Sequence, residues 1–157
     1  MSSDDLNIEE VAATGAAAQQ CLSQYYAELR QRFPEGFDPA KSVLHSLAEF
    51  DPPRGSFLLL RLGNRLVGCG GLTPLEDGAA YLKRMWIAPE ARGLGLGRKL
   101  LEALETKARL LGYRTVKLET HATLAEAQRL YRSSGYREVP PFNDELYADH
   151  WFEKSLV

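Results

Sequence analysis

A single stretch, MWIAPEARGLGLGRKLL at residues 85–101, joins a strand pattern to a helix pattern through a glycine-rich loop. Backbone N–H groups at the start of a helix have no partner within the helix, and the helix dipole adds partial positive charge there. Glycine has no side chain, so it lets the backbone approach an anion closely. The stretch therefore predicts a cradle for a phosphate group at the start of this helix.

Two common phosphate-binding motifs do not fit the cradle. A dinucleotide-binding loop needs G-x-G-x-x-G, but its third glycine would fall at position 98, which is Arg98. A P-loop needs serine or threonine directly after its lysine, but Lys99 is followed by Leu100. The ligand is therefore expected to be a phosphate compound other than those that these two motifs bind.

The residues before the cradle predict a strand, two helices and three consecutive strands. Apolar residues recur at helical spacing between Gly15 and Phe33, and Asp38-Pro39 is typical of the start of a second helix. Gly63-Asn64 joins two apolar runs in the manner of a β-hairpin, so the three strands are expected to form an antiparallel meander. The expected ranges are 6–11 for the first strand, 15–33 and 38–47 for the helices, and 56–62, 65–72 and 79–88 for the meander.

The residues after the cradle predict two helices and three strands. Each helix stops at a glycine, Gly112 or Gly135, which is the residue type that most often ends a helix. The expected ranges are 96–111 and 124–134 for the helices and 115–120, 136–139 and 147–156 for the strands. The order βααβββαβαββ predicts an α/β fold with a mixed sheet, in which the meander is followed by a βαβα half that binds the cofactor.

Length and composition exclude several classes of protein. The 157 residues fit one domain spanning residues 1–157, and the net charge of -2 argues against a nucleic-acid partner. No apolar run approaches the ~20 residues of a membrane span, and the acidic N-terminus is unlike a signal peptide, so we expect a soluble cytoplasmic protein without a membrane partner. Cys21 and Cys69 are expected to be buried side chains rather than a disulfide framework.

The cradle pattern Arg92-x-x-Gly95-x-Gly97 resembles the R/Q-x-x-G-x-G/A motif of the GCN5-related N-acetyltransferases, the GNAT superfamily. Residues 125–136 are similar to the family's A-x-x-L-Y-x-x-x-G-[FY] segment, and 151–156 to its closing strand, so the resemblance covers about residues 56–156. It implies acetyl-CoA as cosubstrate, no metal, and a homodimer as one assembly. The implied cofactor-binding residues are Met85, Trp86, Ile87, Arg92, Gly93, Leu94, Gly95, Leu96, Gly97 and Arg98.

The resemblance also implies direct attack of an amine on the acetyl thioester. The oxyanion donor would be a main-chain N–H near Met85–Ile87, and Tyr131 would be the acid that protonates the leaving thiolate. Many relatives place a glutamate base on the strand before the loop, but this chain has none there. Glu119 on the next strand is therefore the preferred catalytic base, with His121 as the alternative. Leu124 stands where the family often has an asparagine that contacts the CoA arm.

The acceptor is expected to be the primary amine of a small metabolite. A protein N-terminus or lysine is a second option, and an acyl-CoA-binding regulatory protein without turnover is a third. Acceptor choice is expected in two loops, residues 32–38 and 140–147, because loops on a rigid scaffold commonly carry specificity. In these loops and beside them, Phe33, Phe37, Phe142 and Tyr147 could form an apolar wall, Asp144, Glu145 or Asp149 could hold an ammonium, and Arg32 could hold a carboxylate.

Overall fold

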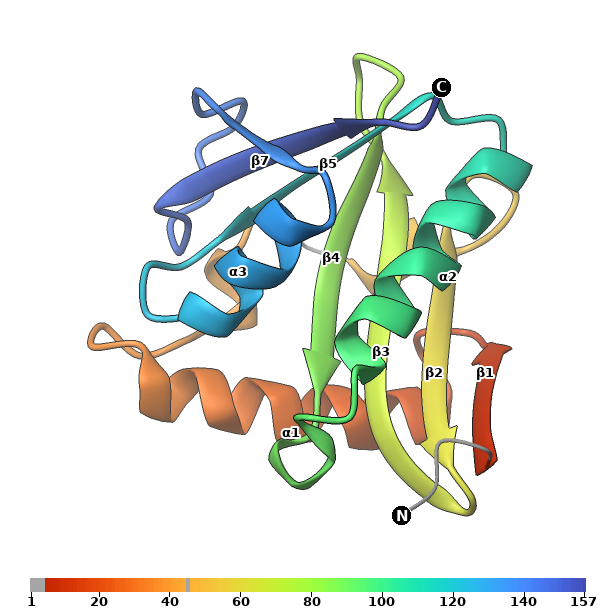
Figure 1. Cartoon of the computed structure of the whole chain (residues 1–157). Helices are drawn as coiled ribbons and strands as arrows, with labels where there is room; N and C mark the ends of the chain where they lie inside the picture. Colours follow the sequence, from red (N-terminus) through yellow and green to blue (C-terminus); the bar gives the residue numbers. More distant parts are fainter. Residues whose placement is uncertain (1–4, 45) are drawn as a thin grey trace.

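The computed structural model describes residues 5–44 and 46–157, which form one mixed sheet with α-helices on both faces (Figure 1). The strands of this part of the chain lie in the order β1-β2-β3-β4-β5-β7-β6, and only the neighbours β4 and β5 run parallel. The strands are β1 (Leu6–Glu10), β2 (Ser56–Leu62), β3 (Arg65–Pro74), β4 (Ala80–Ile87), β5 (Thr115–Thr120), β6 (Arg137–Val139) and β7 (His150–Ser155). The helices are α1 (Ala16–Arg32), α2 (Leu96–Leu110) and α3 (Ala125–Ser133).

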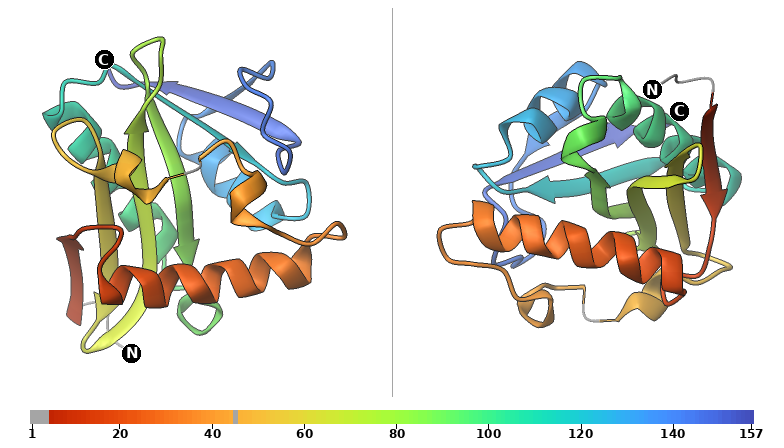
Figure 2. Two further views of the ribbon diagram at one scale, coloured as in Figure 1. Left: turned by 180° about the vertical axis from the view of Figure 1, so that it is seen from behind. Right: turned by 90° about the horizontal axis from the view of Figure 1, so that it is seen from below.

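The helices cover opposite faces of the sheet. α2 and α3 lie in front of the strands in Figure 1, whereas α1 crosses the rear face, as the reversed view of Figure 2 shows. Successive residues of β2 therefore pack against different helices: Leu58 shares a cluster with Leu104 of α2, and Phe57 and Leu59 share one with Leu22 of α1. Because both faces are buried, β2 has a continuous apolar run at residues 57–60 instead of alternating.

Most of the predicted elements are confirmed. The antiparallel meander β2-β3-β4, the helix after the cradle and the parallel return to β5 all form as expected, so the predicted α/β mixed fold is confirmed. Cys21 and Cys69 are both buried and unbridged. None of the helices formed by the described residues has the length and apolar character that crossing a membrane requires.

The predicted second helix over 38–47 is wrong. Asp38 does act as an N-cap, since its Oδ1 accepts from the Ala40 N–H at 3.0 Å, but the turn that follows is a 3-10 helix of only Pro39–Lys41. The buried carboxylate of Glu145 then binds the Ser42 hydroxyl and accepts from the Val43 N–H at 3.4 Å. This contact from a distant part of the chain holds the segment extended, and a second short turn, Leu47–Phe50, starts only at Ser46. Residue 45 lies outside the described residues.

Candidate active site

The site is built around β4, whose two edges differ. One edge pairs with β3, but the other pairs with β5 only at Ala80 and Tyr81, after which the two parallel strands diverge (Figure 1). Parting parallel strands leave main-chain N–H and C=O groups without partners from Leu82 onward. Two cavities lie along this open edge, and they supply the space for a ligand.

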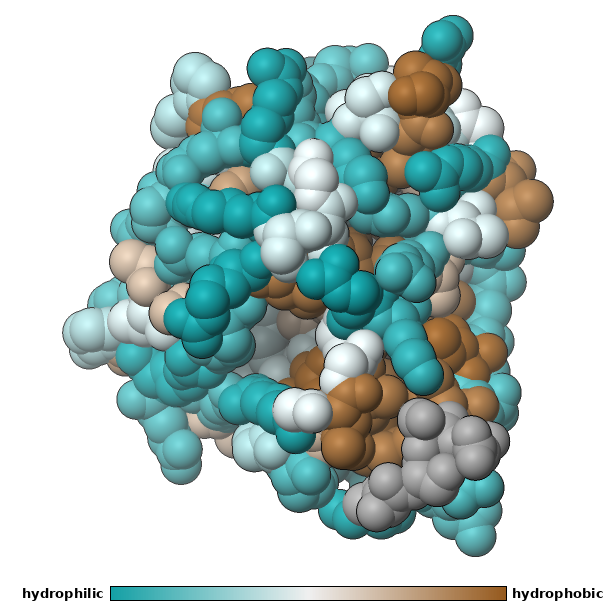
Figure 3. Space-filling model, in the orientation of Figure 1, coloured by the Kyte–Doolittle hydropathy of each residue, from teal (hydrophilic) through white to brown (hydrophobic). Residues whose placement is uncertain are grey.

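The outer cavity, of about 390 Å³, lies between α1, the loop before α2, and α3. A hollow opens between these helices on the face shown in Figure 3, and hydrophilic residues surround much of its rim. The inner cavity, of about 80 Å³, lies deeper, among β4, the end of β5 and the segments around Phe37 and Tyr147. The walls that the two cavities share include Tyr25, Met85 and Tyr131, so this junction is where a ligand of one cavity can meet a ligand of the other.

The glycine-rich loop forms the floor of the outer cavity. Gly93 and Gly95 have φ of 85° and 75°, in the left-handed region that favours glycine, and Gly95 caps α2 without a side-chain hydrogen bond. The first N–H groups of α2 therefore remain available to an anion. A Cβ on Gly97 would lie 3.3 Å from Leu130 Cδ2, so a residue with a side chain there would crowd the gap between α2 and α3. This geometry fits the pyrophosphate of CoA.

The structure brings together almost all the predicted cofactor residues. Those that line the outer cavity are Met85, Trp86, Ile87, Arg92, Gly93, Gly95, Leu96, Gly97 and Arg98. The exception is Leu94, whose residue is 43% exposed and which does not line this cavity. The sequence motif therefore indicated residues that gather around one cavity, but not that Leu94 is turned outward, and their role in binding the cofactor stays a prediction.

Main-chain groups of β4 also face the outer cavity. The Ala88 N–H donates to the Val67 carbonyl of β3 at 2.7 Å. Because the direction of the main-chain groups alternates along a strand, the N–H and C=O of Ile87 point away from β3. The Ile87 carbonyl does face the open edge, where it accepts from Arg92 Nε at 3.0 Å. The N–H of Ile87 is thereby directed toward the same open edge, within the segment Met85–Ile87 that is predicted to supply the oxyanion donor.

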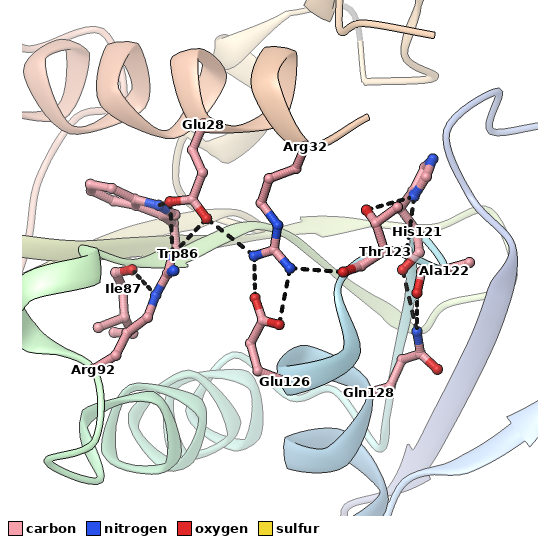
Figure 4. Close-up of polar contacts among 10 residues, drawn as sticks. All are labelled: Glu28, Arg32, Trp86, Ile87, Arg92, His121, Ala122, Thr123, Glu126 and Gln128. Carbon is pink, nitrogen blue, oxygen red and sulfur yellow. Dashed lines mark hydrogen bonds and ion pairs between the residues drawn. The ribbon is translucent and has the colours of Figure 1, made fainter. Parts of the chain in front are cut away.

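Ion pairs cross the outer cavity from α1 (Figure 4). The Glu28 carboxylate accepts from the Trp86 indole N–H at 2.9 Å and from Arg92 at 2.8 Å. Burial alone would raise the pKa of Glu28, but these hydrogen bonds and the guanidinium charge lower it, so the carboxylate stays ionised. Arg32 binds Glu126 of α3 and donates to the Thr123 carbonyl at 2.7 Å. Arg32 is thus already occupied and lies in the outer cavity, which argues against the predicted role in holding an acceptor carboxylate.

Tyr131 lies at the junction of the two cavities, in the last turns of α3. Its residue is only 6% exposed, and its hydroxyl has no hydrogen-bond partner in the part of the chain that the structure describes. Burial, and then the negative charge of Glu119, raise the pKa of Tyr131 well above its usual value. The phenol therefore keeps its proton at neutral pH, as a general acid must.

Glu119 lines the inner cavity with a side chain only 2% exposed. Its Oε1 accepts from Lys83 Nζ at 3.0 Å and from the Tyr81 hydroxyl, whereas its Oε2 is buried without a partner among the described residues. His121 is less suited to be a base. Its Nε2 lies 2.7 Å from a Glu35 carboxylate oxygen, and its Nδ1 accepts from the Thr123 N–H at 3.1 Å, so both ring nitrogens are engaged.

Only some residues of the two loops predicted to select the acceptor lie together at the inner cavity. Phe33, Phe37 and Tyr147 line the inner cavity together, with the rings of Phe37 and Tyr147 4.8 Å apart. Phe142 does not line it, because its ring packs edge-on against Tyr81 beside a separate surface cavity. Asp144 and Asp149 lie outside it as well, and Glu145 lines it but is bound to Lys83 and Ser42.

Sequence reasoning missed several residues of the site, among them Tyr25, Lys83 and Arg84. Arg84 lies where β4 carries an extra residue opposite β3, between the pairs Lys83–Gly71 and Trp86–Cys69, and its φ is 60°. Two consecutive basic residues inside an otherwise apolar central strand were the available signal, because buried charges in a sheet commonly mark a site. Tyr25 gave no signal, because an aromatic residue on the apolar face of a helix usually belongs to the core.

Comparison with known proteins agrees with this geometry. Residues 22–136 match the model of the acetyltransferase (GNAT) family. An IAA acetyltransferase of Azospirillum brasilense is 34% identical over 79% of this chain and 82% of its own length. Among solved structures, a GNAT-family acetyltransferase of Staphylococcus aureus Mu50 superimposes with a TM-score of 0.79 at 21% identity, over 97% of this chain and 99% of that one. A GNAT-family acetyltransferase of Elizabethkingia anophelis with acetyl-CoA bound gives a TM-score of 0.66 at 17% identity, over 97% and 99% of the two chains.

Proposed function

Because the chain belongs to the GNAT acetyltransferase family and is an acetyl-CoA-dependent N-acetyltransferase, we propose that it acetylates the primary amine of a small metabolite by direct transfer. The observation that carries this proposal is the junction of the two cavities. The outer cavity has the cradle that suits acetyl-CoA, and the inner cavity ends in a buried carboxylate that suits an amine. The acetyl donor, acetyl-CoA, and the acceptor amine would thus meet beside Met85 and Tyr131.

The residues of the outer cavity would hold acetyl-CoA, which supplies an acetyl thioester. The N–H groups at the start of α2 would bind the pyrophosphate, with Arg92 and Arg98 nearby to offset its charge. The N–H groups of Met85 and Ile87 would donate to the thioester oxygen as negative charge develops on it. These donors belong to a strand of the sheet, so they need little reorganisation during the reaction.

Two proton movements remain for side chains at the junction. Glu119 Oε2 would take the proton that the amine must lose before its lone pair can attack. The Tyr131 hydroxyl would give a proton to the departing sulfur. No side chain is needed as a nucleophile, which agrees with the burial of Cys21 and Cys69 away from both cavities.

The size of the inner cavity supports a small acceptor. Its free volume is only about 80 Å³, and the rings of Phe33, Phe37 and Tyr147 close one side. An extended peptide would need an open groove, whereas a compact amine needs only room for its own atoms. The IAA acetyltransferase relative supports the same choice.

An acceptor screen tests the proposal. The protein is incubated with acetyl-CoA and a panel of amines, amino acids, polyamines and short peptides with free N-termini, and the release of free CoA is followed. We expect turnover with at least one small amine and none with the peptides. Turnover with peptides alone would favour a protein acceptor, and a flat response to the whole panel despite tight acetyl-CoA binding would favour a non-catalytic binding protein.

Acetyl-CoA is expected to raise the melting temperature of the protein. A ligand at about 100 times its Kd adds roughly 2.7 kcal/mol of apparent stability when it binds only the folded state. NAD and ATP should shift the melting temperature much less, because the loop lacks both of their motifs. Differential scanning fluorimetry with each ligand makes the comparison, and the absence of any shift with saturating acetyl-CoA would contradict the assignment of the cradle.

A further inference from the structure

Two side-chain polar atoms that are completely shielded from solvent have no hydrogen-bond partner within residues 5–44 and 46–157: Arg84 Nε and Glu119 Oε2. Both residues line the inner cavity. One atom is a donor on a cation and the other is an acceptor on an anion. Leaving such groups unpaired in a protein interior is costly, so a site with one of each is suited to a ligand that satisfies both.

Arg84 is buried without a carboxylate beside it. Its residue is 7% exposed, and no described carboxylate lies within 4.0 Å of its guanidinium. Its contacts are weak: a hydrogen bond from Nη2 to the Leu44 carbonyl at 3.5 Å, and the rings of Tyr26 and Phe37 at 5.6 and 5.9 Å. Guanidinium binds carboxylate in a two-pronged geometry that a carbonyl cannot reproduce.

The backbone at Arg84 is shaped to hold this side chain in place. A non-glycine residue with φ of 60° is strained by about 1–3 kcal/mol and persists only where its surroundings impose it. Here the bulge on β4 imposes it, since Arg84 is an extra residue in the ladder with β3. Such strain is common at binding sites, where it directs one side chain toward a ligand.

The other charged groups that line the inner cavity are already paired. Lys83 Nζ lies 3.0 Å from Glu119 Oε1 and 3.2 Å from Glu145 Oε1, so it bridges the two carboxylates. His121 is bound to Glu35, and Glu145 also accepts from Ser42 and the Tyr147 N–H. The unmet requirements of the cavity are therefore one anion for Arg84 and one proton donor for Glu119.

We propose that the acceptor is an amino acid in the broad sense, a compact molecule with both a primary amine and a carboxylate. Arg84 binds the carboxylate and so determines specificity, while Glu119 receives the amine. This inference rests on the proposed function, since it assigns the acceptor of that same site. A simple amine would leave Arg84 unpaired, so it would bind more weakly than its carboxylated counterpart.

Matched sets of acceptors test this on the wild-type protein. Each set holds an amino acid, its amide and the amine without the carboxyl group: alanine, alaninamide and ethylamine, with equivalent sets for β-alanine and γ-aminobutyrate. In at least one set the amino acid should exceed both analogues in kcat/KM by roughly 10- to 150-fold, the range for a hydrogen bond to a charged group. Equal turnover within every set would overturn this inference and leave the proposed function standing, whereas no turnover of any amine would overturn the proposed function itself.

Variants of Arg84 separate recognition from packing. Arg84→Gln should raise KM for the amino acid by roughly 10- to 150-fold and leave KM for its amide and for acetyl-CoA nearly unchanged, and Arg84→Lys should recover part of the loss. Arg54→Gln is the matched control, because Arg54 also lies over an aromatic ring, at 5.0 Å from Tyr113, but outside both cavities. An equal loss for acid and amide in Arg84→Gln would mean a structural role and would overturn the inference.

A measurement without mutation covers the case in which Arg84 variants do not fold. Propionate and butyrate offer a carboxylate of suitable size without an amine. At least one of them should inhibit the wild-type enzyme competitively against the amine and not against acetyl-CoA, while propionamide and butyramide should have little effect. Failure of both carboxylates to inhibit more strongly than their amides would contradict an anion site in the inner cavity.

Discussion

Replacing Tyr131 with phenylalanine is expected to lower kcat about 10²- to 10⁴-fold, the usual contribution of a general acid, and to leave acetyl-CoA affinity nearly unchanged. The hydroxyl lies where the two cavities meet and has no partner among the described residues, so removing it disturbs no internal hydrogen bond. The ring stays in place, packed against Tyr136 and Phe152 with centroids 5.8 and 6.0 Å away. Steady-state kinetics and acetyl-CoA titration of the variant measure the two effects separately.

Two matched variants make this prediction specific. Tyr136→Phe removes a neighbouring hydroxyl that donates to Glu105 at 2.8 Å, so it should cost about 1–3 kcal/mol of stability and leave kcat nearly unchanged. Tyr25→Phe tests the other phenol at the junction, which faces the same two cavities from α1. If Tyr131→Phe turned over normally while Tyr25→Phe did not, the acid would be Tyr25 and the assignment made from the family motif would be wrong.

Replacing Gly97 with valine is expected to lower kcat/KM for acetyl-CoA on the order of 10²-fold, because the pyrophosphate could no longer approach the start of α2. Gly97 lies in the first turn of α2, and even a Cβ would come within 3.3 Å of Leu130 Cδ2 on α3. The branched side chain would therefore both crowd the cradle and push α3 away from it. Isothermal titration with acetyl-CoA measures the loss directly.

Gly97→Ala is the graded control, since it adds only the Cβ and should give a smaller loss in the same direction. Circular dichroism and the melting temperature of each variant show whether the fold has survived. A folded Gly97→Val protein that binds acetyl-CoA with wild-type affinity would contradict the placement of the cofactor on this loop.

Local sequence patterns predicted the elements whose form is determined locally. Gly93 and Gly95, with positive φ, determine the shape of the loop before α2, and the apolar residues of α2 recur at helical spacing, which is a local feature of the sequence. The segment from 38 to 47 is different, because Asp38 caps a turn as expected but Ser42 is held by Glu145, 103 residues away in the chain. A contact between residues so far apart in the sequence leaves no local sequence pattern.

The same distinction applies to the site. The loop before α2 and Tyr131 could be singled out from the sequence because each lies within a short motif. The structure places both at the outer cavity, and their roles in binding and catalysis stay predictions. Glu119 was the preferred base from the sequence alone, and that role stays a prediction. The role proposed for Arg84 had no comparable local motif, because it depends on a bulge in β4 that turns the arginine into the inner cavity. Phe142 was misplaced for a related reason: the loop after β6 folds its ring onto Tyr81, outside the cavity that Tyr147 lines.

The most direct test of direct acetyl transfer to a small amine follows the acetyl group itself. The protein is mixed with isotope-labelled acetyl-CoA, first alone and then with the amine panel, and both the intact protein and the small molecules are analysed by mass spectrometry. Without an amine the protein should keep its unmodified mass. With the panel, label should appear on a small amine in an amount equal to the CoA released. Label that first accumulates on the protein and then passes to the amine, or that is never found on any small amine, would contradict the account.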